Sequence, residues 1–174
     1  MTPADLSSIP IRTTVCWLRR RFSPREIATT VLPPQDLHRQ HNTMRKFITE
    51  GPGLPAWSSP ISHAVVVDAI CYLSGQLSIG GSGAYVPGTA QEEAQRAFGN
   101  LFSAIMAADF LVGDLAFVDI ALLDLDDLAA VNALYADLFP ADRRPARTVY
   151  QAAALPFGGR VKVMGVAIRD SATP

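Results

Sequence analysis

Three side chains in this 174-residue sequence have the chemistry to hold or transform a small anionic molecule. The guanidinium of Arg147 is a planar fork that pairs with a carboxylate through two hydrogen bonds and stays charged at any working pH. Asn132 falls within an expected helix, where asparagine is mildly unfavourable, so a specific hydrogen bond is indicated. His63 titrates near neutral pH and is a candidate general base. Each also has a structural interpretation: a surface ion pair, a loop anchor and a hydrogen-bonded core histidine.

Other polar patterns point to no cofactor. The carboxylates within 124–127 lack the glycine and distal glutamate of a calcium loop, and the start of a helix explains them. The glycine-rich run 80–83 lacks the Lys-Ser or Lys-Thr of a phosphate loop. Cys16 and Cys71 match no zinc spacing and are too few for a disulfide framework. We therefore expect neither a metal nor a cofactor.

The composition favours a folded domain. The chain is 49% hydrophobic and 18% charged, which excludes a mainly disordered protein. No stretch approaches the roughly eighteen consecutive apolar residues of a membrane span. The net charge of −1 offers no electrostatic argument for nucleic-acid binding. We expect a cytoplasmic protein that binds neither membrane nor nucleic acid.

Residues 1–43 differ in composition from the rest. Six arginines stand against three acidic residues there, and five prolines interrupt any apolar period. No apolar stretch follows the charges, so the segment resembles a secretory signal poorly. We interpret it as an N-terminal extension, either a mobile tail or sequence upstream of a start at Met44. The predicted domain covers residues 44–174.

The remaining sequence predicts strands and helices that alternate. A helix begins after Thr89, with Glu92 completing a capping box, and runs to near residue 108. A second helix, capped by Asp124 or Asp126, ends near Phe139. Strands are predicted over 46–49, 63–67, 70–77, 115–123, 148–155 and 161–168, the second and third forming a hairpin.

This order of elements leaves one face of a sheet uncovered. Two helices cannot cover both faces of six strands, so the prediction is an α+β fold with both helices on one face. A half-apolar chain does not leave the other face bare in water. We expect copies of the chain to associate through it.

Five short motifs carry a resemblance to a known family. They are Pro60–Ala64, Tyr72–Gln76, Ala130–Tyr135, Pro145–Thr148 and Ala154–Pro156. Together, in this order and at these spacings, they resemble the RidA/YjgF family of reactive-intermediate deaminases, which carries the older label endoribonuclease L-PSP family. The resemblance covers residues 44–169.

The resemblance implies a chorismate-mutase-like fold and a homotrimer. In such trimers the sheets form a central barrel, and ligand clefts lie between subunits. The implied reaction is hydrolysis of 2-imino or enamine acids to 2-oxo acids and ammonia, without metal or cofactor. It implies that Arg147 grips the carboxylate of the ligand and that Ser74 and Asn132 occupy pocket positions.

Three replacements depart from the family pattern. Met164 stands where deaminating members carry a glutamate that positions water, Ile61 replaces a tyrosine of the cleft, and Val149 replaces a common cysteine. His63, two residues after Ile61 and expected on the same face of a strand, is a candidate replacement base. Lys162 is expected on the same face as Met164, as a second anion contact or a solvated side chain.

Three functions stay open at this point. The first is hydrolysis of a carboxylate-bearing imine or enamine. The second is a non-hydrolytic step of a biosynthetic pathway, such as a cyclisation, isomerisation or condensation, which the apolar replacements favour. The third is binding of small carboxylates without catalysis. RNA cleavage is not favoured, because residues 44–174 are net acidic and offer no histidine pair.

Overall fold

The computed structural model describes residues 44–170, and the extension predicted for residues 1–43 lies outside them. The described chain forms strands and helices in the predicted order. The strands are β1 (Arg45–Ile48), β2 (Ala64–Val67), β3 (Ile70–Gln76), β4 (Leu115–Leu122), β5 (Ala146–Gln151) and β6 (Val161–Ile168), and the helices are α1 (Ala90–Ala107) and α2 (Leu128–Leu138). Short 3₁₀ turns, η3 (Val112–Asp114), η4 (Leu125–Asp127) and η5 (Pro156–Gly158), precede β4, α2 and β6.

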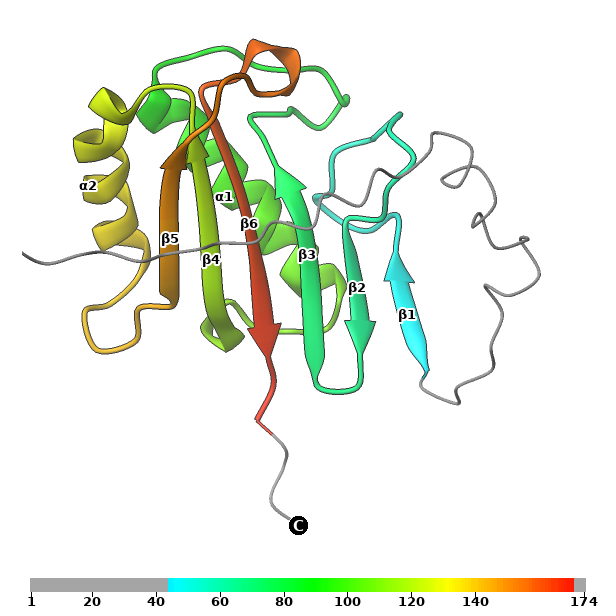
Figure 1. Ribbon diagram of the computed structural model, residues 1–174. Coiled ribbons are helices and arrows are strands. Elements are labelled where there is room, and N and C mark those ends of the chain that lie inside the picture. Colours follow the sequence, from blue (N-terminus) through cyan, green and yellow to red (C-terminus); the bar gives the residue numbers. More distant parts are fainter. Residues whose placement is uncertain (1–43, 171–174) are drawn as a thin grey trace, which may run out of the picture. The chain divides into compact units, whose positions relative to one another are not determined.

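The strands form one mixed sheet with the order β1-β2-β3-β6-β4-β5. Neighbouring strands are antiparallel except β4 and β5, which run parallel. Both helices lie on the same side of the sheet, with α2 beside the edge strand β5 (Figure 1). The predicted α+β architecture, with six strands and two helices on one face, is confirmed.

The helix α1 begins as its sequence predicts. The Thr89 hydroxyl accepts a hydrogen bond from the backbone N–H of Glu92 at 3.3 Å, and the Glu92 carboxylate accepts one from the backbone N–H of Thr89 at 2.8 Å. This capping box satisfies two backbone donors that the first turn leaves unpaired. The buried side of α1 centres on Phe98, which contacts the rings of Tyr135 and Phe139 and so joins the two helices.

The β2–β3 hairpin forms where it is predicted, whereas β5 begins and ends earlier than predicted. The β2–β3 hairpin turns at Asp68, whose φ of 53° lies in the left-handed region that aspartate tolerates. The strand predicted over 148–155 instead covers Ala146–Gln151. It stops there because its partner β4 ends at Leu122, whose carbonyl accepts the last hydrogen bond from the Ala152 N–H at 2.8 Å.

Alternation along the strands gives the sheet two different faces. In β6, Val161, Val163, Gly165 and Ala167 are buried toward the helices, and the residues between them lie on the other side. We call that other side the open face. It includes Phe47, Val65, Tyr72, Phe117, Asp119, Thr148, Tyr150, Lys162, Met164, Val166 and Ile168. Association of copies through this face stays a prediction.

Candidate functional site

Arg147 lies on the helix side of the sheet edge. Its Cα pairs with that of Val118 on β4, a residue fully buried under the helices. The guanidinium carbon lies 4.5 Å from the centre of the Tyr135 ring on α2, and this cation–π contact orients the side chain. Within residues 44–170, no carboxylate lies within 4.0 Å of this guanidinium. Its hydrogen-bonding fork is therefore available to an anion.

A groove of about 330 Å³ opens beside Arg147. It is lined by Asn132, Tyr135, Ala136, Arg144, Pro145 and Arg147, and we call it the edge groove. On α2, Tyr135 and Ala136 lie three and four positions after Asn132, so one side of the helix forms one wall. The Tyr135 hydroxyl donates to the Pro145 carbonyl at 3.3 Å and holds the other wall against the helix. The structure thus brings Arg147 and Asn132 to one groove.

The edge groove is electropositive. Two guanidiniums line it, and that of Arg144 is positioned by a 3.3 Å hydrogen bond from its Nε to the Phe139 carbonyl. Burial raises the pKa of the Tyr135 hydroxyl, and the charges of Arg147 and Arg144 oppose that rise. Tyr135 therefore stays protonated at neutral pH, so it adds no negative charge to the groove. Such a groove suits a small carboxylate.

Met164 lies on the opposite face of the sheet from Arg147. Its Cα pairs with that of Asp119 on β4, and both side chains lie on the open face. Met164 is 41% exposed. Val149 projects on the same side as Arg147 but is half-buried against the hydrophobic core and is not part of the groove lining. Within a single chain, the side chains of Arg147 and Met164 therefore lie on opposite faces of the sheet.

Ser74 and Gly75 occupy an irregularity of β3. The Ser74 hydroxyl donates to the Ser62 carbonyl at 2.7 Å, so this hydrogen bond holds the segment before β2. Pairing of β3 with β6 is irregular between Leu73 and Gln76. A Cβ at Gly75 would collide with Cε of Lys162, so glycine here leaves room for a lysine side chain rather than for close approach of backbone.

His63 is buried, and its predicted placement beside Ile61 on one strand face is wrong. Both residues precede β2, which begins at Ala64, and the chain bends between them. Ile61 is 46% exposed, whereas His63 is 3% exposed and packs edge-on against Trp57 at 5.2 Å. Burial lowers the pKa of His63, opposed by a hydrogen bond to the Pro55 backbone. Burial and the Trp57 contact favour a core histidine, but its Nδ1 has no hydrogen-bond partner among residues 44–170.

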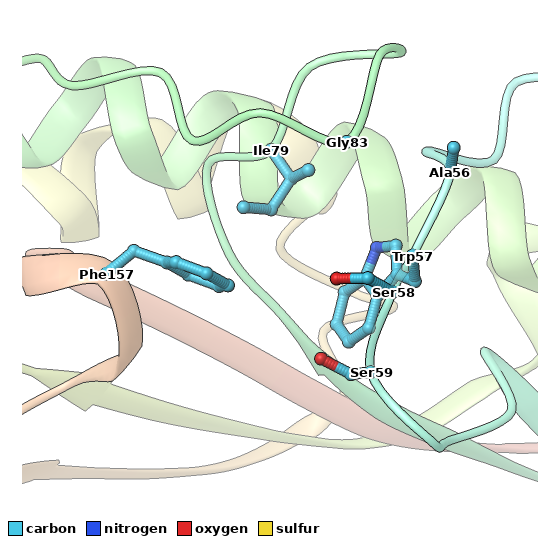
Figure 2. A pocket seen from close by; sticks show the side chains of 7 residues that line it. All are labelled: Ala56, Trp57, Ser58, Ser59, Ile79, Gly83 and Phe157. Atoms are coloured by element: carbon cyan, nitrogen blue, oxygen red, sulfur yellow. The ribbon is translucent and has the colours of Figure 1, made fainter.

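A second, smaller pocket of about 50 Å³ lies between the segment that follows β3 and the segment that precedes β2 (Figure 2). Its lining is Ala56, Trp57, Ser58, Ser59, Ile79, Gly83 and Phe157. Gly83 has a φ of +83°, and a Cβ there would collide with the Ala56 carbonyl, so this contact requires glycine. The volume is enough for one or a few water molecules at roughly 10–15 Å³ each. The sequence contains no pattern that marks this pocket.

Two groove residues and one open-face residue escaped the sequence analysis. Tyr135 is three positions after Asn132 on the same helix, so its spacing was an available signal, whereas Arg144 lies in the loop before β5 and had none. The neighbour of Met164, Asp119, had no such signal, because strand register is not visible in one sequence. Within residues 44–170 no helix is long and apolar enough to cross a membrane, and no group of three potential metal ligands occurs.

The chain is similar to known proteins in sequence and in fold. The sequence profile of the Endoribonuclease L-PSP family matches residues 54–169. A protein from Capra hircus named 2-iminobutanoate/2-iminopropanoate deaminase is 40% identical over 120 residues, which cover 68% of this chain and 87% of the relative. A Bos taurus protein of the same name is 38% identical over 131 residues, covering 75% and 94%. The crystal structure of Escherichia coli TdcF with bound serine superposes with a TM-score of 0.64 at 27% identity, covering 71% of this chain and 99% of that one.

Proposed function

Because the chain belongs to the Endoribonuclease L-PSP family, which is the RidA/YjgF family, we propose that it hydrolyses a small 2-imino or enamine carboxylic acid to the 2-oxo acid and ammonia. The observation that carries this proposal is the edge groove, where Arg147 has no acidic partner among the described residues and shares the lining with Asn132. The names of the relatives from goat and cattle describe the same class of substrate.

Arg147 binds the carboxylate of the substrate in this proposal. Its two terminal nitrogens meet the two oxygens, and Tyr135 beneath the guanidinium limits its rotation. The Asn132 amide, on the wall of the same groove, donates to a carboxylate oxygen or to the carbonyl oxygen of the product. The serine bound to TdcF also carries a carboxylate beside a nitrogen-bearing carbon, which supports this class of ligand.

The complete site needs two copies of the chain in this proposal. The carboxylate and the imine carbon of a 2-imino acid are adjacent, so the groups that hold one and attack the other must converge. Arg147 and the open-face residues around Met164 lie on opposite sides of one sheet. A neighbouring copy that places its open face near the edge groove brings them together. A homotrimer whose sheets face inward provides three such clefts.

A specific observation also favours a non-hydrolytic alternative. Met164 and Ile61 present exposed apolar side chains where the family resemblance places a glutamate and a tyrosine. A cleft lined by these groups admits less water, and an imine or enamine bound there is protected from hydrolysis. In that case the same Arg147 groove holds a carboxylate while the substrate cyclises, isomerises or condenses.

The experiment measures ammonia release from 2-imino acids that an amino-acid oxidase forms in situ. We expect wild type to exceed the buffer rate and Arg147→Ala to fall to it, because the carboxylate loses its partner. The matched control is Arg143→Ala, which removes an exposed arginine that lies next to Asp142 and is not in the groove lining. A wild-type rate equal to the buffer rate would contradict hydrolysis of these substrates, and binding of the 2-oxo acid that depends on Arg147 would then support the non-hydrolytic alternative.

A further inference from the structure

We infer that Arg144 selects a substrate with a second carboxylate, so that the preferred ligand of the edge groove is a 2-imino acid whose side chain also ends in a carboxylate. This inference rests on the proposed function and deepens it by naming the substrate class. Its basis is the lining of the edge groove, to which both Arg144 and Arg147 belong. Arg147 alone can bind the carboxylate that every 2-imino acid carries, so the second guanidinium provides a binding point for a second anion.

Neither guanidinium of the edge groove is neutralised by the part of the chain that the structure describes. No ion pair among residues 44–170 includes Arg144 or Arg147. The carboxylate of Asp142, two positions before Arg144, lies instead 4.0 Å from Nε of Arg143. The groove lining contains no acidic side chain. Two like charges in one groove repel each other, and a ligand with two negative charges offsets this repulsion more completely than a ligand with one.

Different contacts hold the two guanidiniums in place. The Arg144 Nε donates a 3.3 Å hydrogen bond to the Phe139 carbonyl at the end of α2, whereas the guanidinium of Arg147 lies over the Tyr135 ring at 4.5 Å. The rings of Phe139 and Tyr135 pack against each other with their centroids 4.6 Å apart. Because this hydrogen bond uses only Nε, the two terminal nitrogens of Arg144 remain for a carboxylate. One packed pair of residues on α2 therefore positions two separate binding points for anions.

The size of the edge groove also favours a diacid over the smallest imino acids. Its volume is about 330 Å³, where one water-sized group needs roughly 10–15 Å³. An imine with a methyl or ethyl side chain fills only part of this space and leaves Arg144 without a partner. A side chain of one or two methylene groups with a terminal carboxylate extends from the Arg147 end of the ligand and gives Arg144 an anion to bind.

The test compares two substrates of equal chain length in the imine hydrolysis assay with the full-length protein. The imine of glutamate carries the second carboxylate, the imine of norvaline ends in a methyl group, and amino-acid oxidases form both in situ. We expect wild type to hydrolyse the diacid with a kcat/KM about tenfold higher. Arg144→Ala should raise KM for the diacid about tenfold, because a hydrogen-bonded charge pair is lost, and should leave its kcat and the KM for the norvaline imine nearly unchanged.

Two further variants separate the charge of Arg144 from its contact with the protein. Arg143→Ala removes the neighbouring arginine, which lies beside Asp142 and outside the groove lining, and should keep the preference for the diacid. Arg144→Gln keeps an N–H donor for the Phe139 carbonyl but no charge, so it should lose the preference as Arg144→Ala does. Circular dichroism shows whether each variant is folded.

Equal kcat/KM values for the two imines in wild type, or a preference that both Arg144 variants retain, would overturn the inference and leave the proposed hydrolysis in place. An equal rise in KM for both imines in the Arg144 variants would also overturn it, because Arg144 would then bind the carboxylate that both share. If wild type does not exceed the buffer rate, the proposed hydrolysis fails, and calorimetry with 2-oxoglutarate and 2-oxopentanoate tests the inference alone. Tighter binding of the diacid that depends on Arg144 supports it, and equal or undetectable binding overturns it.

Discussion

The edge groove and the open face share one sheet but differ in almost every physical property. The groove combines α2 and β5, carries two guanidiniums and an amide, and contains no acidic side chain in its lining. The open face consists of strands alone, and most of its side chains are apolar, among them Phe47 and Tyr72, which are 59% and 50% exposed. Its single strand carboxylate is Asp119. The edge groove is thus suited to binding a small anion, and the open face is suited to packing against another protein surface.

The edge groove and the open face could contribute different things to the proposed reaction. A groove that grips a carboxylate provides affinity and orientation but no group to activate water. The open face holds the one strand carboxylate, but its exposed apolar side chains are unfavourable in water until another surface covers them. Association through the open face would bury these apolar side chains.

We expect the largest effect from a substitution that places a charged side chain on the open face. Val166 lies at the centre of this face, between its cross-strand partners Tyr72 and Phe117. Val166→Asp places a carboxylate on a surface that must lose its water when copies associate, so we expect the proposed trimer to dissociate and the proposed hydrolysis to be lost. Light scattering measures the mass, and circular dichroism checks that the chain is folded. The matched control Met106→Asp changes a 59% exposed methionine on α1 and should leave the mass unchanged.

A smaller effect is expected within the groove itself. Asn132→Ala removes a hydrogen bond to a charged ligand, and we expect KM to rise about tenfold with kcat nearly unchanged. Asn132→Asp should raise KM further, because a carboxylate in the groove repels the substrate. Asp137→Ala on the same helix is the control, since Asp137 is exposed and outside the groove lining. An unchanged KM in both Asn132 variants would remove this amide from the site.

The smallest effect concerns His63 and is expected on stability alone. Burial lowers the pKa of His63 below its ordinary value of 6.5, so the unfolded chain binds the proton more readily than the folded one. The stabilisation is therefore present above pH 6.5 and is lost as the pH falls below it. Between pH 7 and pH 5 we expect the Tm to fall, and His63→Gln to reduce this dependence. Loss of turnover in a folded His63→Gln protein would instead support a catalytic role.

The site residues differ in how far the sequence predicted them. Arg147 and Asn132 were named from side-chain chemistry and family motifs, and they line one groove. Ile61 and His63 were expected to alternate along a strand, but that segment precedes β2, so one is exposed and the other is buried.

The sequence alone determined the elements of this protein, their order and the family to which it belongs, because capping residues, apolar periods and short motifs are local signals. Only the tertiary structure decided which side chains share a face. Strand register placed Asp119 beside Met164 and put Arg147 on the other side of the sheet. Register depends on packing between strands that are distant in the chain, and a shift of one residue would exchange the two faces.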